Sequence, residues 1–132
     1  MKKEFFTPST LYPTFGYSHV VTVEGGKLVV LSGLVPFDKE CEIIGEGDFA
    51  AQAKQVFENI GRALGAAGAT YNDVIKLNYY VVDFKTECRE ILAKIRDQYI
   101  PTVNPPASVL LGVSALAVPG MLIEIEATAF IE

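Results

Sequence analysis

The chain has 132 residues, half of them hydrophobic, and a formal net charge of −5 at pH 7. This length predicts one domain, residues 1–132, that can bury a core without disulfides. The acidic balance makes nucleic acid an unlikely partner and gives no support for binding to anionic membranes. A single histidine, His19, and two cysteines without metal-ligand spacing, Cys41 and Cys88, predict no metal site.

The first ten residues, MKKEFFTPST, hold no apolar run of the length that a signal sequence or a membrane span requires. We therefore expect a cytoplasmic protein. In that reducing compartment both cysteines would be free thiols.

Two segments rich in valine and leucine, 17–23 and 27–35, begin the pattern of secondary structure. The tripeptide Glu24-Gly25-Gly26 between them predicts a hairpin turn, because glycine tolerates a positive φ. A loop to Gly47 follows. Inside the second segment, Ser32-Gly33 interrupts the apolar run, which predicts a bulge or the close approach of a ligand or another backbone.

A helix is predicted from Asp48, as its N-cap, to Gly68, as the first residue beyond its C-cap. Its apolar residues recur at helical spacing and form one face. They are Ala53, Val56, Phe57, Ile60, Leu64 and Ala67.

Three strands and a second helix fill the rest of the chain. The strands are predicted at 74–84, 107–116 and 122–131, and the helix is predicted to begin with Thr86 as its cap and to end before Pro101. The resulting order ββαβαββ indicates an α+β fold with both helices on one face of a mixed sheet.

Apolar residues lie on both faces of the predicted strand 27–35. Leu28, Val30 and Leu34 fall on one face, and Val29, Leu31 and Val35 fall on the other. Two helices can cover only one face of the sheet. We therefore expect a second copy of the chain to cover the other.

The candidate chemistry is sparse. Glu124 and Glu126 share one face of the last strand, where a carboxylate could act as a general acid or base, or could belong to a solvated face, which is the more common case. His19 has no acid or nucleophile motif beside it. Tyr17 either lines a pocket or packs as an ordinary aromatic residue, and 78–80 look like ordinary strand residues.

Four segments in order resemble one known family. They are GYSHVV at 16–21, LVVLSGLVP at 28–36, AAQAKQVFENIGRALGAAGATYNDVIKLNYYVVDF at 50–84 and PPASVLLGVSALAVPGMLIEIEATAF at 105–130. They are similar to the Rid (YjgF-type) enamine/imine deaminases. The resemblance implies a chorismate-mutase-like fold, a homotrimer with a small-molecule ligand at each subunit interface, and no cofactor.

The resemblance also implies roles for single residues. Glu124 would hold the attacking water, Tyr17 would shape the pocket, and the backbone at Ser32 and Gly33 would fix the substrate, a 2-imino acid or its enamine. Ser108 stands where the deaminating members have the arginine that binds the substrate carboxylate, and it would contact the substrate in its place. Two further replacements, Leu34 for a glutamine and Leu110 for a cysteine, make the predicted pocket more apolar.

The missing arginine leaves two functions open. A hydroxyl contributes about 0.5–1.5 kcal/mol where a charged contact contributes about 1.5–3 kcal/mol, so carboxylate binding would be roughly tenfold weaker. No arginine near Ser108 in the sequence compensates, since Arg62, Arg89 and Arg96 lie on predicted helices. The chain is then an enamine/imine deaminase of weak or altered specificity, or a non-catalytic trimer that binds a small metabolite or serves regulation. The acidic balance counts against a ribonuclease.

Overall fold

The computed structural model describes all residues, 1–132. Its elements are β1 (Lys2–Phe6), β2 (Val20–Glu24), β3 (Lys27–Val30), α1 (Phe49–Ala66), a short 3₁₀ helix (Tyr71–Asp73), β4 (Val74–Val82), α2 (Thr86–Arg96), β5 (Ala107–Val113) and β6 (Ile123–Ile131). The predicted α+β class is confirmed. The chain has one strand more than predicted, because β1 precedes the expected order.

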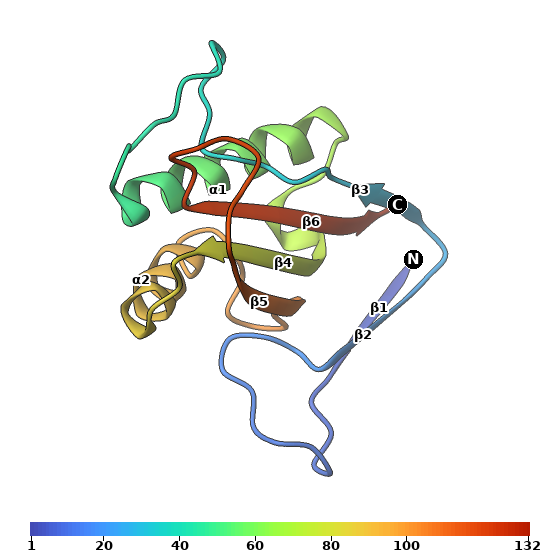
Figure 1. Cartoon of the computed structure of the whole chain (residues 1–132). Helices are drawn as coiled ribbons and strands as arrows, with labels where there is room; N and C mark the ends of the chain where they lie inside the picture. The colour runs from blue at the N-terminus through green and yellow to red at the C-terminus, as the bar shows by residue number, and fades with distance from the viewer.

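The main sheet has the strand order β3-β6-β4-β5. The pair β4–β5 is parallel and is connected through α2, while β6 runs antiparallel to both β3 and β4, so the sheet is mixed. Both helices lie on one face of this sheet (Figure 1). This is the predicted arrangement and the one found in the chorismate-mutase-like fold.

The predicted hairpin around Glu24-Gly25-Gly26 is wrong. Strand β2 pairs with β1, and β3 pairs instead with the end of β6 in the other sheet. Gly25 has a φ of +62°, which turns the chain from one sheet to the other. Gly26 has no room for a side chain, since a Cβ atom there would lie 2.6 Å from the ring of Phe130.

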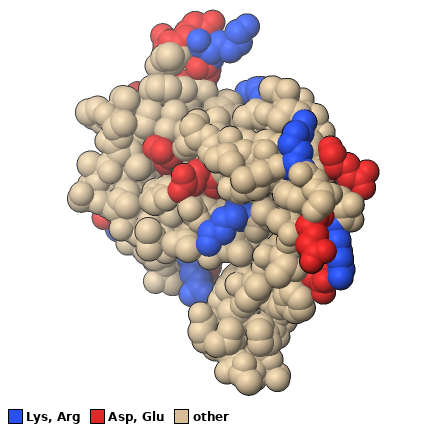
Figure 2. All heavy atoms as spheres, turned by 90° about the vertical axis from the view of Figure 1, so that its right-hand side faces the viewer, with Lys and Arg blue, Asp and Glu red and all other residues tan.

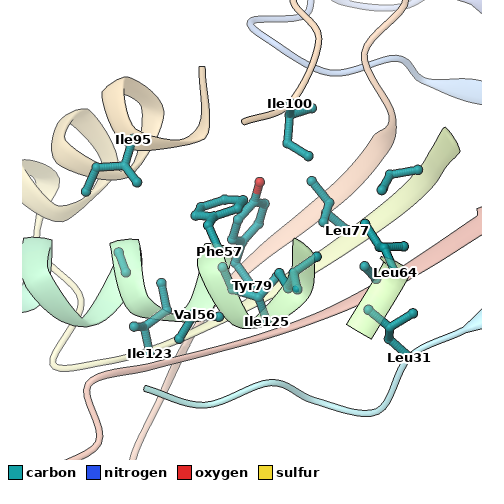
Figure 3. Packing of buried hydrophobic residues seen from close by; sticks show 14 of the residues in the cluster. Leu31, Val56, Phe57, Leu64, Leu77, Tyr79, Ile95, Ile100, Ile123 and Ile125 are labelled. Atoms are coloured by element: carbon teal, nitrogen blue, oxygen red, sulfur yellow. The ribbon is translucent and has the colours of Figure 1, made fainter. Parts of the chain in front are cut away.

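Helix α1 forms as its sequence predicts. The Asp48 side chain accepts a hydrogen bond from Ala51 N at 3.1 Å, and Gly68, with a φ of +77°, follows the C-cap. The apolar face is fully buried at Ala53, Val56, Phe57, Ile60 and Leu64. It packs on the buried face of β6, so that Val56 lies near Ile123 and Ile125 in the core (Figure 3).

Helix α2 begins one residue earlier than predicted. Its N-cap is Lys85, whose side chain makes no capping hydrogen bond, and Thr86 is the first helical residue. Leu92 and Ile95 face the core, whereas Ile91 is 36% exposed. The helix is therefore held by its packing rather than by its cap.

One buried polar side chain ties two loops to α1. Gln52 Nε2 donates to the carbonyl oxygens of Gly45 at 3.1 Å and Gly120 at 2.9 Å, and Gln52 Oε1 accepts from Leu122 N at 2.7 Å. All of its hydrogen-bonding groups are used, which is what allows it to be fully buried. The chain just before β6 is thereby fixed in place.

The face of the sheet without helices carries exposed apolar side chains at both edges. Leu28 and Val30 on β3 are 57% and 70% exposed, and Val109 and Leu111 on β5 are 38% and 47% exposed. Val29, on the helix side of the same β3 strand, is only 8% exposed. Both faces of β3 are thus apolar, as predicted, and only one of them is covered within the chain.

Candidate functional site

Glu124 projects from the face of the sheet that has no helices. Its neighbours Ile123 and Ile125 are fully buried on the helix side, so Glu124 points the other way. In the register of β4 and β6, Glu124 pairs with Tyr80, and residues paired across two strands share a face. The candidate catalytic carboxylate therefore stands on the uncovered face.

The bulge predicted at Ser32-Gly33 is present and lies against this carboxylate. Leu31 N donates to Ala127 O at 3.0 Å, and Leu34 N donates to Ile125 O at 2.8 Å. The chain thus advances three residues after β3 while β6 advances two, and the extra residue forms the bulge. A Cβ atom at Gly33 would lie 2.8 Å from Glu124 Cδ. Glycine at this position makes room for the carboxyl group.

The two glutamates of β6 differ in their partners. Glu126 accepts hydrogen bonds from Asn78 Nδ2 at 2.9 Å and from Tyr80 Oη at 2.5 Å, whereas Glu124 accepts none within the chain. The bond from Tyr80, followed by that from Asn78, lowers the pKa of Glu126. The same bond raises the pKa of Tyr80, because the phenol proton is shared with a carboxylate. The carboxylate of Glu126 is therefore used in hydrogen bonds within the sheet, whereas the carboxylate of Glu124 is free to bind water or a ligand.

The interpretation of Asn78 and Tyr80 as ordinary strand residues misses their contact with Glu126. A signal for it exists in the sequence. Residues 78 and 80 on β4 are two positions apart, and so are residues 124 and 126 on the neighbouring strand β6. When the strands pair 78 with 126 and 80 with 124, all four side chains lie on one face of the sheet.

Ser108 lies on the opposite face. It pairs with Leu77, which is 1% exposed on the helix side, so its side chain points towards the helices. Ser108 and Tyr17 line one cavity of about 880 Å³, formed by the segment 12–17, α2 and β5. The buried Ser18 holds this segment in place, because its Oγ donates to Pro105 O at 2.6 Å and its N donates to Pro106 O at 3.1 Å.

The site residues predicted from the sequence thus fall into two groups. Gly33 and Glu124, with Ser32 next to Gly33 in the chain, form one group around the bulge, which we call the carboxylate half-site. Tyr17 and Ser108 form the other, which we call the pocket half-site, in the cavity. The two groups project from opposite faces of the sheet, so one chain does not bring them together.

Two arginines lie near Ser108 in space although they are distant in sequence. Arg89 and Arg96 on α2 line the same cavity, together with Leu110. The expectation that no arginine compensates for Ser108 considered sequence distance alone; in the fold, α2 brings two arginines into the lining of the cavity that Ser108 also lines. Gly16 lies directly on the Arg96 guanidinium, since a Cβ atom there would stand 2.7 Å from Cζ.

His19 packs between aromatic rings. Its ring centroid lies 4.8 Å from that of Tyr12 and 6.0 Å from that of Tyr17, in edge-on geometry. Both ring nitrogens are buried without a hydrogen-bond partner. His19 does not line the cavity, and no carboxylate contacts it.

The fold and these two half-sites define a small α+β protein with polar groups on both faces of a mixed sheet. Residues 7–131 match the family described as Endoribonuclease L-PSP, and the chain belongs to this family, which is also known as the YjgF or Rid family. The predicted resemblance is thereby confirmed over nearly the whole chain.

Individual relatives match the chain from end to end. A RutC family protein from Pyrococcus horikoshii is 36% identical over 134 residues, with 100% of both chains covered. The 3-aminoacrylate deaminase RutC from Acinetobacter baylyi is 28% identical, with 99% of this chain and 100% of its own covered. The crystal structure of YyfB from Yersinia pestis, a Rid family protein of unknown function, has a TM-score of 0.85 and 37% identity, covering 99% and 100%.

The charges on the surface are mixed. In Figure 2, lysine and arginine side chains lie among aspartate and glutamate side chains and form no basic stripe on this face. The chain also contains no helix that combines the length and the apolar character needed to cross a membrane.

Proposed function

We propose that this protein is a hydrolytic deaminase of enamines or 2-imino acids, and that it works as a homotrimer with a site between neighbouring subunits. The observation that carries the proposal is Glu124, a carboxylate without a hydrogen-bond partner that lies beside the glycine bulge. The 3-aminoacrylate deaminase among the relatives supports the reaction class. The two free cysteines, Cys41 and Cys88, fit a reducing compartment, and we place the protein in the cytoplasm.

The proposed reaction needs one water and one general base. Glu124 accepts a proton from water as the water oxygen attacks the imine carbon, while the imine nitrogen takes up a proton. Glu124 then returns its proton to the amino nitrogen of the resulting carbinolamine, the hydroxyl proton passes to water as the C=O bond forms, the C–N bond breaks, and a 2-oxo acid and ammonia leave. Carbon keeps its oxidation state throughout, so the reaction requires no cofactor.

The two half-sites support the assembly of subunits in the proposed trimer. Glu124 on one face cannot reach a ligand beside Tyr17 and Ser108 on the other face of the same sheet, so a second subunit has to supply one of the two groups. The exposed Leu28 and Val30 on the face of Glu124 give that subunit an apolar surface to bury. Ser32 and Gly33 would then offer backbone groups to a ligand between the subunits.

The alternative is a trimer that binds a small metabolite without turnover. Ser108 favours it, since a neutral hydroxyl occupies the place of the family's carboxylate-binding arginine. The neighbouring Leu110 makes the cavity more apolar. A regulatory role would then replace catalysis.

A coupled assay separates the two functions. A pyridoxal-phosphate dehydratase releases iminopropanoate, and the protein should speed the appearance of pyruvate above the spontaneous rate. Glu124→Gln should lower this rate about a hundredfold or more, because it removes the general base. Glu126→Gln is the matched control, since an amide oxygen can still accept from Asn78 and Tyr80, and it should keep most of the rate.

Two results would contradict the deaminase. One is a rate equal to spontaneous hydrolysis with every imine tested. The other is a Glu124→Gln variant that stays as active as the wild type. Ligand binding without turnover would then establish the metabolite-binding trimer.

A further inference from the structure

A stripe of α2 residues forms one wall of the cavity. Thr86, Arg89, Ala93 and Arg96 recur at helical spacing and all face it. The other charged residue that lines the cavity is Asp97, so the cavity has a net positive charge. The protein as a whole is acidic, and this local reversal of sign favours an anionic ligand.

Arg96 is held in a fixed position. Its side chain is 21% exposed, and its Nε and Nη2 both donate to Asp97 Oδ1, at 3.1 and 3.0 Å. Nη1 donates to no group in the chain. Gly16, with a φ of +78°, also lies against this guanidinium. A guanidinium that is already ordered loses little freedom when it pairs with a carboxylate.

A buried hydroxyl lines the same cavity. Tyr79 is 4% exposed, and its Oη has no hydrogen-bond partner. In Figure 3 this oxygen points away from the sheet, towards the side on which Ile95 and Ile100 lie. Burial raises the pKa of Tyr79, so its hydroxyl remains a neutral donor. Since buried hydroxyls in folded proteins nearly always have a partner, this one is a donor that a ligand in the cavity can use.

Four aromatic side chains form a further part of the cavity lining, which we call the aromatic wall. They are Tyr12, Phe15, Tyr17 and Phe84, and Tyr12 and Phe15 are 66% and 71% exposed. The volume of about 880 Å³ falls in the range of small-molecule sites. Such a wall suits a planar apolar group better than the methyl group of iminopropanoate.

We propose that this cavity binds an organic acid with an aromatic side chain, whose carboxylate pairs with Arg96 and whose ring packs on the aromatic wall. Tyr79 donates a hydrogen bond to a polar group of the ligand. Arginine on α2 thus takes the role of the β5 arginine that Ser108 replaces. That the ligand is a 2-imino acid rests on the proposed deaminase function, whereas the binding of its carboxylate does not.

Calorimetric titration of the wild-type protein tests the proposal without turnover. The probe is phenylpyruvate, which is the 2-oxo acid product of an aromatic substrate. It should bind at least about tenfold more tightly than pyruvate, which lacks the ring, and than 3-phenylpropanamide, which lacks the charge.

Variants on α2 identify the cation. Arg96→Gln should weaken phenylpyruvate binding about tenfold or more. Arg96→Lys keeps the charge but loses the planar guanidinium that can donate two parallel hydrogen bonds, and it should weaken binding less. Lys94→Gln removes the same charge from the same helix turn outside the cavity, and its affinity should equal that of the wild type. Tyr79→Phe should weaken binding a few-fold, because it removes the hydroxyl donor alone.

Unchanged phenylpyruvate affinity in Arg96→Gln, or equal affinity for the amide, would overturn the proposal. Should Arg96→Gln fail to fold, Arg96→Lys and Tyr79→Phe probe the same contacts, and unchanged affinity in both would overturn it equally. The deaminase assay is scored separately. If phenylpyruvate binding depends on Arg96 but no imine is turned over, only the proposed deaminase function is refuted. If imines are turned over but Arg96→Gln does not change binding, only the inference about the cavity is refuted.

Discussion

Replacing Gln52 by leucine should destabilise the protein strongly although the volume of the side chain hardly changes. The substitution leaves the carbonyls of Gly45 and Gly120 and the N–H of Leu122 without their partner. Gly120 is exposed and its carbonyl can turn to water, which leaves two half-buried groups unsatisfied. At about 1–3 kcal/mol for each of the two groups, the free energy of unfolding should fall by roughly 2–6 kcal/mol.

Urea unfolding at one fixed protein concentration measures this loss, because the stability of an oligomer depends on concentration. Gln55→Leu is the control. It lies on the same helix, and its Nε2 donates only to Asn59 Oδ1, so its effect should stay within about 0.5 kcal/mol. If Gln52→Leu unfolds within about 0.5 kcal/mol of the wild type, the loops are not held by this side chain and the reasoning fails.

Three further predictions concern the uncovered face. Gly33→Ala should lower the deaminase rate about tenfold or more, because the new methyl group displaces the flexible end of the Glu124 side chain. The Tm should change little. An unchanged rate would show that the position of this carboxylate does not matter. Val30→Lys should convert the proposed trimer to monomers in sedimentation, while Val103→Lys, on a residue 77% exposed in a loop, should not. A Val30→Lys variant that remains trimeric would show that the interface does not include Val30. Two hydrogen bonds hold the pKa of Glu126 below its usual 4.5, so this stabilisation is complete above about pH 4.5 and is lost as the pH falls through the folded pKa. Glu126→Gln should therefore flatten the acid limb of stability against pH, and an unaltered limb would contradict the role of these bonds.

Local patterns in the sequence predicted the local parts of the fold. The cap at Asp48, the glycine after α1 and the buried face of α1 all depend on residues within a few positions of each other, and all are confirmed. The Ser32-Gly33 bulge is also a local signal. Strand pairing is not local, and the hairpin failed for that reason, because Gly25 turns the chain equally well into a hairpin or from one sheet into another.

The candidate site likewise has features that the sequence predicts and features that depend on contacts between distant parts of the chain. Its residues could be named from the resemblance to the Rid family, but the faces from which they project depend on register between strands far apart in sequence. Arg89 and Arg96 line the same cavity as Ser108 because the fold places α2 and β5 on either side of it. No spacing in the sequence carries that information. The different hydrogen bonding of Glu124 and Glu126 likewise depends on β4, which lies more than 40 residues earlier.

If the site is shared between subunits as proposed, the opposite orientation of Glu124 and Ser108 has a genetic consequence. A subunit with a defective carboxylate half-site still carries an intact pocket half-site, and the reverse holds for a subunit altered at Arg96. When two such inactive variants are unfolded together and reassembled in equal amounts, about a quarter of the interfaces in a closed cyclic trimer join two intact halves. Two alleles that each encode an inactive subunit would therefore complement one another. Conversely, subunits encoded by one defective allele would also inactivate sites that they share with normal subunits.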